Sequence, residues 1–269
     1  MTESGQLRVR PPAVAGSFYP ADPDQLIDGL RSSFAAAYRP DGDQPVPKAL
    51  IVPHAGHVYS GPIAASAYLR LIPGRTTIRR VVLLGPSHRV PLEGMAVSSA
   101  DALATPLGLI PVDDPARRAA LAGPGVRVDD TAHAAEHSLE VQLPFLQVVL
   151  DRFAVLPIAV GRCDADDVAA VLDLVWGGPE TVIVVSTDLS HYQRYDDAVT
   201  LDRRTAATIA ASRPEAIGDR DACGAYPLRG LLVAASGRRL PIELLDLRNS
   251  GDTAGDKQRV VGYGAFTVG

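Results

Sequence analysis

Short runs of apolar, largely β-branched residues alternate along the chain with longer stretches whose apolar positions recur at helical spacing. Strands are predicted at 49–52, 81–85, 95–99, 153–160 and 181–186. Helices are predicted at 62–71, 115–121, 138–152, 165–176, over much of 198–212, and at 227–236. This alternation is typical of βαβ units.

The two final strand candidates, 242–247 and 260–268, have no helix between them and are expected to pair antiparallel. Continuously apolar strands separated by helices indicate a sheet that is covered on both faces. No linker, charge run or internal repeat divides the chain, and 39–47 is expected to be a surface loop. We predict a single α/β domain over residues 1–269, with a mixed, mostly parallel central sheet and helices on both faces.

The composition and charge of the chain exclude several classes of protein. The 269 residues are 46% hydrophobic and 21% charged, as in an ordinary globular protein, which excludes a disordered or fibrous chain. A net charge of -5 offers no electrostatic footprint for nucleic acid. The chain has neither an apolar run long enough for a membrane span nor a signal-peptide pattern at its start. We expect a cytoplasmic protein that contacts neither nucleic acid nor membrane.

Three polar clusters come directly after predicted buried strands, at 53–57, 85–89 and 187–191. They contain His54, His57, His88 and His191, which are four of the six histidines, and Asp188. Ligands of open α/β sheets bind outside the carboxyl ends of the strands, so these clusters are expected to converge. Imidazole binds metals and transfers protons near neutral pH.

Two more clusters carry reactive side chains. At 136–140, Ser138 is predicted to cap a helix, and Glu136 and His137 have two open interpretations, as helix-end residues or as groups for proton transfer and metal-ligand orientation. Cys223 precedes the helix predicted to begin near 227, where a thiolate is favoured and its pKa lowered. Cys163 has no obvious partner and is interpreted as structural. None of these clusters is a strong local metal motif on its own.

Together the segments are those of a known family. They are PAVAGSFYPADPDQL at 12–26, PHAGHVYSG at 53–61, LLGPSHRVPL at 83–92, EHSLEVQLPFL at 136–146, VSTDLSHY at 185–192 and ACGAYP at 222–227. The chain resembles the Memo family, whose prokaryotic branch is called AmmeMemoRadiSam system protein B. The resemblance runs in order from about 10 to 266.

That resemblance implies a fold like the class III extradiol dioxygenases, which hold non-haem Fe(II) with two histidines and a carboxylate. Carried over by motif, the metal ligands are His54, His88 and, in place of the carboxylate, Cys223. His191 is implied as the acid/base group, with Asp188 beside it and His137 as another pocket histidine. A soft thiolate makes Zn or Cu an alternative to Fe(II), so dioxygenase chemistry does not follow automatically.

Two functions remain open at this stage. The first is a metal-dependent oxidoreductase, dioxygenase-like, acting on an unknown substrate. The second is a module that binds a peptide or small ligand in the same crevice. Phe18, Tyr19 and Tyr59 could line it, although ordinary core or rim packing is the favoured interpretation of these aromatic residues. The family name also implies association with a radical-SAM protein.

Overall fold

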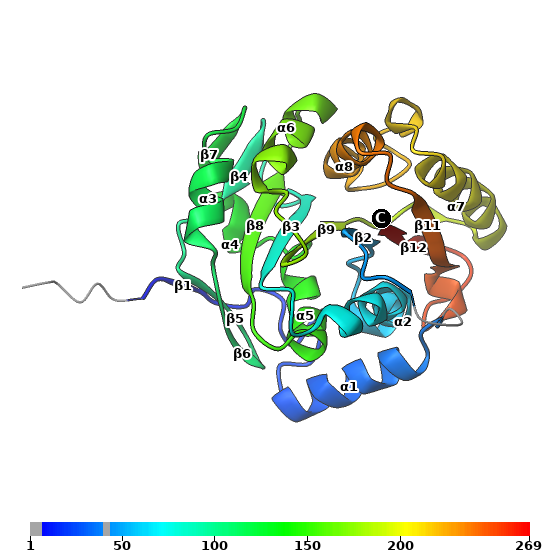
Figure 1. Ribbon diagram of the computed structural model, residues 1–269. Helices are drawn as coiled ribbons and strands as arrows, with labels where there is room; N and C mark the ends of the chain where they lie inside the picture. Colours follow the sequence, from blue (N-terminus) through cyan, green and yellow to red (C-terminus); the bar gives the residue numbers. More distant parts are fainter. Residues whose placement is uncertain (1–6, 40–43) are drawn as a thin grey trace, which may run out of the picture.

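The four central strands of the main sheet are almost entirely apolar, because helices cover both of its faces. The computed structural model describes residues 7–39 and 44–269 (Figure 1). Its neighbouring parallel strands are, in order, β2 (Ala49–Val52), β9 (Thr181–Ser186), β3 (Arg80–Pro86) and β8 (Ala154–Val160). Since these strands are parallel, their carboxyl ends lie at one edge of the sheet.

Antiparallel strands extend this sheet on both sides. On one side, β12 (Val260–Val268) pairs with β2, with β11 (Ile242–Asn249) and with β10 (His191–Gln193). On the other, β4 (Met95–Val97) pairs antiparallel with β8 and parallel with β7 (Val126–Val128). The predicted mixed sheet and the antiparallel pair at the end of the chain are confirmed.

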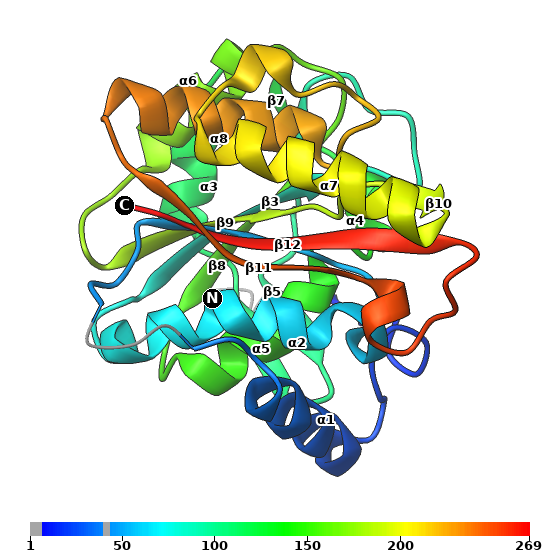
Figure 2. The ribbon, with the colours of Figure 1, turned by 90° about the vertical axis from the view of Figure 1, so that its right-hand side faces the viewer.

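Two helical layers enclose the sheet. One contains α1 (Pro23–Ala35), α2 (His57–Tyr68) and α5 (Leu143–Val149); the other contains α3 (Asp114–Ala120), α6 (Ala165–Val175), α7 (Tyr195–Ala210) and α8 (Ala225–Gly237). Figure 2 shows β12 running between α2 on one side and α7 and α8 on the other. Alternation in β9 supplies both cores, because Val182 and Val184 join the first and Ile183 and Val185 the second.

Several elements were not predicted. They include a small sheet of β1 (Val9–Arg10), β5 (Ala102–Thr105) and β6 (Gly108–Pro111), and the short helical segments α4 (Thr131–Ala134), η3 (Pro214–Ala216) and η4 (Ser250–Asp252). Two further 3₁₀ segments, η1 (Leu69–Gly74) and η2 (Glu140–Gln142), overlap helices that were predicted. The N-terminal helix α1 was also missed, although Asp22 caps it by accepting a hydrogen bond from the Gln25 amide at 3.0 Å.

Two helix boundaries differ from the prediction. The helix expected over 62–71 already begins at His57. The helix expected over 138–152 is reduced to η2 and α5, and Ser138 is not its cap, because its hydroxyl donates to the Pro86 carbonyl at 2.9 Å. Within the predicted loop at 39–47, residues 40–43 lie outside the described residues.

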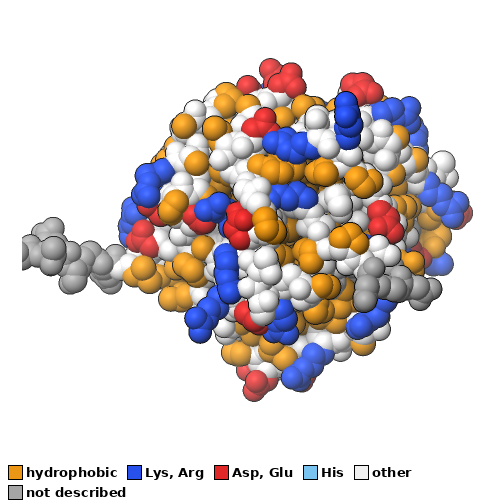
Figure 3. Space-filling model, viewed as in Figure 1, with side chains coloured by type: hydrophobic (Ala, Val, Ile, Leu, Met, Phe, Trp, Pro, Cys, Tyr) orange, Lys and Arg blue, Asp and Glu red, His pale blue; other side chains and the backbone are white. Residues whose placement is uncertain are grey.

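The surface has mixed charge. On the face shown in Figure 3, Lys and Arg side chains are interspersed with Asp and Glu and with hydrophobic groups. Among the described residues, no helix has the length and apolar character needed to cross a membrane.

Candidate metal centre

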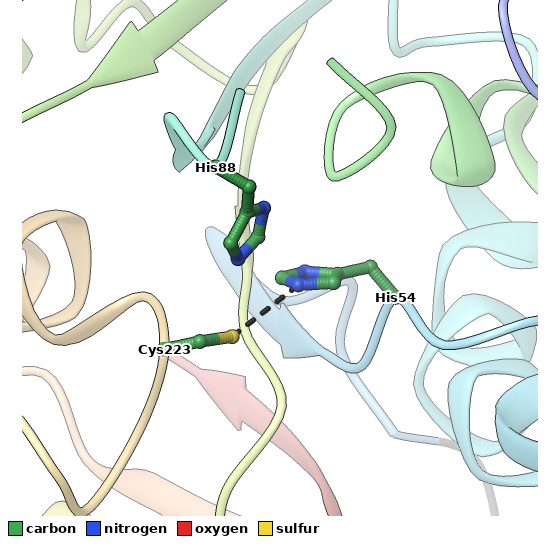
Figure 4. Close-up of side chains that lie close together, drawn as sticks. All are labelled: His54, His88 and Cys223. Carbon is green, nitrogen blue, oxygen red and sulfur yellow. Dashed lines mark hydrogen bonds between the residues drawn. The ribbon is translucent and has the colours of Figure 1, made fainter. Parts of the chain in front are cut away.

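Loops from distant parts of the chain bring His54, His88 and Cys223 together (Figure 4). His54 follows β2, His88 follows β3, and Cys223 lies in the turn before α8. One ligand atom from each residue lies within 4.8 Å of the others, and His54 Nε2 is 3.3 Å from Cys223 Sγ. The expected convergence of strand-end clusters is thus seen in the structure.

The tautomer of His54 is set by Ser186. His54 Nδ1 lies 2.8 Å from Ser186 Oγ, which donates its own proton to the Ser138 carbonyl at 2.6 Å. Ser186 therefore accepts from His54, so Nδ1 carries the proton and Nε2 keeps its lone pair. Burial, followed by the neighbouring His88 and His137, lowers the pKa of His54, which keeps its ring neutral.

A buried chain of hydrogen bonds stands behind Ser186. The Tyr68 hydroxyl donates to Gln142 Oε1 at 2.8 Å, which orients the amide group. Gln142 Nε2 then donates to Ser186 Oγ at 2.8 Å and to the Pro53 carbonyl at 2.9 Å. The sequence analysis did not identify Tyr68, Gln142 or Ser186 as part of the site. The one feature that could have indicated them is that each is a polar residue within an apolar run.

Glu136 orients His88 in a similar way. Its two oxygens accept from the His88 amide at 2.5 Å and from Nδ1 at 3.0 Å. Burial alone would raise the pKa of Glu136, but hydrogen bonds from His88 and the Ser138 amide lower it well below its usual range. Glu136 is thus a carboxylate that accepts the His88 Nδ1 proton, and His88 Nε2 is left as an acceptor. Of the two interpretations of Glu136, this geometry favours ligand orientation.

His137 lies against the same histidines. Its ring stacks on His88 with centroids 4.7 Å apart, and Phe18 covers it at 4.7 Å. Burial lowers the pKa of His137 to about 4, so the ring is neutral at pH 7. Within 7–39 and 44–269, its Nδ1 makes no hydrogen bond, although Glu136 Oε1 lies 3.2 Å away.

Cys223 is fixed by the turn after β9. Its sulfur accepts from the Asp188 amide at 3.2 Å, and its own amide donates to the Asp188 carbonyl at 3.1 Å. Gly224 permits this approach, because a β-carbon there would overlap Thr187. The expected lowering of the Cys223 pKa is wrong for the metal-free protein: burial, together with the Asp188 charge, raises it. Burial also raises the pKa of Cys163, to about 12.

Asp188 and His191 lie in one turn beside the centre. Asp188 Oδ1 accepts from the His54 amide at 2.7 Å, and burial raises the pKa of this carboxyl to about 6. His191 Nδ1 donates to the Leu189 carbonyl at 2.8 Å, so its Nε2 is also left as an acceptor. Asp202 holds this turn by accepting from the Ser190 amide at 2.9 Å. Gly262 lets β12 approach, because a β-carbon there would overlap Asp202.

The remaining histidines point elsewhere. His57, in the same cluster as His54, is buried and donates from Nε2 to the Val141 carbonyl at 3.0 Å. His133 is buried too, with Nε2 bonded to the Ala96 carbonyl at 3.0 Å. Both belong to the packed interior.

Two crevices lie beside the centre, and His191 lines both. The aromatic crevice, of about 580 Å³, is lined by Phe18, Tyr59, His137, Asp188 and Tyr192 among others. The α7 crevice, of about 610 Å³, is lined by His88, Arg204, Arg220 and Cys223 among others. Tyr19 is buried, which agrees with the packing interpretation of this residue.

The three residues suit a divalent transition metal. The 3.3 Å between His54 Nε2 and Cys223 Sγ is close to the separation of about 3.5 Å for nitrogen and sulfur bound to one tetrahedral ion. Both histidines have Nδ1 engaged and Nε2 open, the arrangement of metal-binding histidines. His88, Glu136 and His137 form a second close group, but the Glu136 oxygens already accept from surrounding amides. The first group is therefore the better candidate site.

Comparison with known proteins gives matches over nearly the whole chain. The family described as Memo-like protein matches residues 10–267. A MEMO1 family protein of Methanopyrus kandleri is 36% identical over 96% of this chain and 98% of its own, and one from Aquifex aeolicus is 36% identical over the same shares. Among solved structures, an uncharacterized protein from Escherichia coli K12 aligns with 14% identity and a TM-score of 0.48, over 80% of this chain and 98% of that one.

Proposed function

Since the chain belongs to the Memo-like protein family, we propose that it is a metal-dependent oxidoreductase whose metal ligands are His54 Nε2, His88 Nε2 and Cys223 Sγ. The observation that carries the proposal is the pattern of hydrogen bonds around the histidines. Ser186 and Glu136 engage the Nδ1 atoms, so both Nε2 atoms keep a lone pair, and that of His54 lies within hydrogen-bond distance of the Cys223 thiol.

Fe(II) is our first choice of metal, with Zn and Cu as alternatives, because imidazole and thiolate ligands suit all three. Such an ion would supply Lewis acidity and, as iron, redox chemistry on a substrate or on dioxygen. With Cys223 as the third ligand, the thiol proton has to leave when the metal binds.

The surrounding residues supply proton transfer. His191 Nε2 has a lone pair and lines both crevices, so it can take a proton from a bound substrate and return it. Asp188 lies close to His191, and its negative charge stabilises the protonated ring. His137 is neutral near pH 7 and lines the aromatic crevice, where it can donate or accept a hydrogen bond. We assign His191, Asp188 and His137 as the catalytic residues.

One observation favours the alternative, a non-enzymatic module that binds a peptide or small ligand. Tyr192, at the aromatic crevice, is 64% exposed and has a φ of 60°, a conformation that non-glycine residues rarely adopt. Strained, exposed aromatic residues cluster at ligand sites. Such binding would not need the metal.

Elemental analysis of protein purified without a nickel column separates these functions. We expect close to one equivalent of iron, removed by chelation together with any oxygen consumption. His54→Ala should lose the metal, whereas His191→Ala should keep it and lose turnover. A metal-free protein that binds peptides tightly would establish the module instead, and equal metal loss in both variants would show that His191 is misassigned.

A further inference from the structure

The α7 crevice differs in charge from the aromatic crevice. It lies between α7 and the 217–223 segment and is lined by the side chains of His88, His191 and Cys223. Arg204 and Arg220 also line it, together with Asp219 and Asp221. Anything that enters by this side meets charged groups just before it meets the candidate ligands.

Both carboxylates of the α7 crevice are already paired. Asp221 lies 3.3 Å from Arg204 and also accepts from the Gly218 amide at 2.7 Å. Asp219 pairs with Arg229, from α8, and accepts from the Tyr226 hydroxyl at 3.2 Å. The carboxylates therefore have their guanidinium partners without Arg220.

Arg220 is the unmatched charge. In the part of the chain that the structure describes, its side chain forms no ion pair, and no hydrogen bond from its guanidinium is found. Two arginines and two aspartates line the α7 crevice, and Arg220 is the one of these four residues without a counter-ion among the described residues. A planar guanidinium matches a carboxylate in a two-point contact, and one spare charge matches a monoanion better than a phosphate dianion.

We propose that the α7 crevice admits a small carboxylate to the centre, with Arg220 as the residue that selects its charge. The inference rests on the proposed function for what the carboxylate meets, since it assigns the α7 crevice as one substrate entrance. The aromatic crevice, on the other side of His191, then takes a different reactant or the product.

Alkylation of Cys223 tests this selectivity without the metal. The full chain is stripped with a chelator and treated with iodoacetate or iodoacetamide, and the peptides of Cys223 and Cys163 are read separately by mass spectrometry. For each cysteine, the rate with iodoacetate is divided by the rate with iodoacetamide, and this ratio is normalised to that of glutathione. The thiolate fraction cancels in the ratio, which therefore reports the local electrostatic field. Cys163 is the internal control, because the charges near it are mostly negative, with Asp167, Asp164 and Glu93 against Arg229.

We expect the anion preference at Cys223 to be about threefold or more above that at Cys163, and to fall with added salt. Arg220→Glu should remove this preference, and Arg220→Gln should reduce it. Arg259→Glu, which changes the aromatic crevice, should leave it unchanged. The proposal is overturned if Arg220→Glu has no effect, if Arg259→Glu has the same effect, or if neither reagent reaches Cys223.

A competition assay tests the ligand class. Acetate at tens of millimolar should slow labelling of Cys223 by iodoacetamide about twofold in the wild type and not in Arg220→Glu. Phosphate at equal ionic strength should protect less, and equal or stronger protection by phosphate would refute the carboxylate. Because the assay uses metal-free protein, its failure leaves the metal-content result untouched, and loss of the metal site would not alter these ratios.

Discussion

Two buried polar clusters, both assembled from distant segments, have opposite designs. In the first, the Glu140 side chain is fully buried and accepts from Arg10 Nη1 at 2.7 Å, the Tyr19 hydroxyl at 2.6 Å and the amides of Ala13 at 2.7 Å and Val14 at 2.9 Å. Arg10 also donates to the carbonyls of residues 11, 133 and 136. Every strong acceptor site on this carboxylate is filled.

In the second cluster, the candidate metal centre, the hydrogen bonds from the surrounding protein reach only one nitrogen of each histidine ring. Ser186, Glu136 and the Leu189 carbonyl engage the Nδ1 atoms of His54, His88 and His191, and the Nε2 atoms keep their lone pairs. A closed network fixes a segment in place, whereas one that leaves aligned lone pairs is prepared to bind something. Both clusters are buried, so burial alone does not distinguish them. They differ because only the second leaves lone pairs of its histidine rings without a donor from the surrounding network.

Breaking the closed network should have the largest effect on stability. Glu140→Gln leaves the Arg10 guanidinium buried without its charge partner, and we expect a loss of about 3–5 kcal/mol in the free energy of unfolding. Urea denaturation of chelated protein measures it. Asp151→Asn, which removes an exposed pair with Arg75, is the control and should cost less than about 1 kcal/mol. A similar small loss in both variants would mean that the Glu140 network is not a structural clamp.

Acid should next affect His57, whose ring lies 5.4 Å from that of Tyr19 at the border of the closed network. Burial lowers the pKa of His57 to about 4, below the value of about 6.5 in the unfolded chain. Its stabilising contribution is complete above pH 6.5 and is lost as the pH falls toward 4, by up to about 3 kcal/mol. His57→Gln, which keeps a donor for Val141, should lose that much less stability between pH 7 and pH 4. Parallel pH dependence in both proteins would contradict this assignment.

A change behind the candidate metal centre should act on metal binding more than on folding. Ser186→Ala removes the acceptor of the His54 Nδ1 proton, and we expect metal affinity to fall about 10–100-fold. Competition with a chromophoric chelator measures it. Ser66→Ala is the matched control, since Ser66 is equally buried but bonds to Asp246. An unchanged affinity in Ser186→Ala would show that the tautomer of His54 is fixed in another way.

The smallest effect is expected at the turn that carries His191. Asp202→Ala removes the acceptor of the Ser190 amide, so exchange of this amide with solvent should become about five- to tenfold faster. Asp202→Asn keeps an oxygen there and should preserve protection. A second measurement, of the ¹⁵N chemical shifts of the His191 ring, reports its tautomer. We expect a mixture of the two tautomers only in the Ala variant. Loss of protection in both variants would mean that the Asp202 charge, and not its geometry, holds the turn.

The sequence was sufficient to predict where the candidate site lies, but not to predict the residues that hold its histidines in place. Polar clusters after 49–52, 81–85 and 181–186 predict convergence because parallel strands share one carboxyl edge. The family motifs added Cys223, whose position before α8 says nothing by itself about its neighbours. Ser186, Gln142 and Tyr68 could not be identified, because each is one polar residue in an apolar run whose partner lies far along the chain.

Local propensity also failed where tertiary contacts decide the backbone. The motif at 136–140 has the composition of a helix start, but the Glu136 carboxylate is used by His88 and the Ser138 hydroxyl by Pro86. The helix therefore starts later, at Leu143, after the turn of η2. The pKa of Cys223 follows the same rule: burial raises it, although Cys223 lies just before the start of α8.

The spacing of the candidate ligands has a consequence for biogenesis. His54 and Cys223 are 169 residues apart, so no short nascent segment carries the complete set. A zinc finger, whose ligands lie within a few dozen residues, folds around its ion as it is made. Here the chain has to be synthesised beyond residue 223 before the three donors can meet. If the proposed centre binds a metal, the ion is therefore expected to enter after much of the chain has folded.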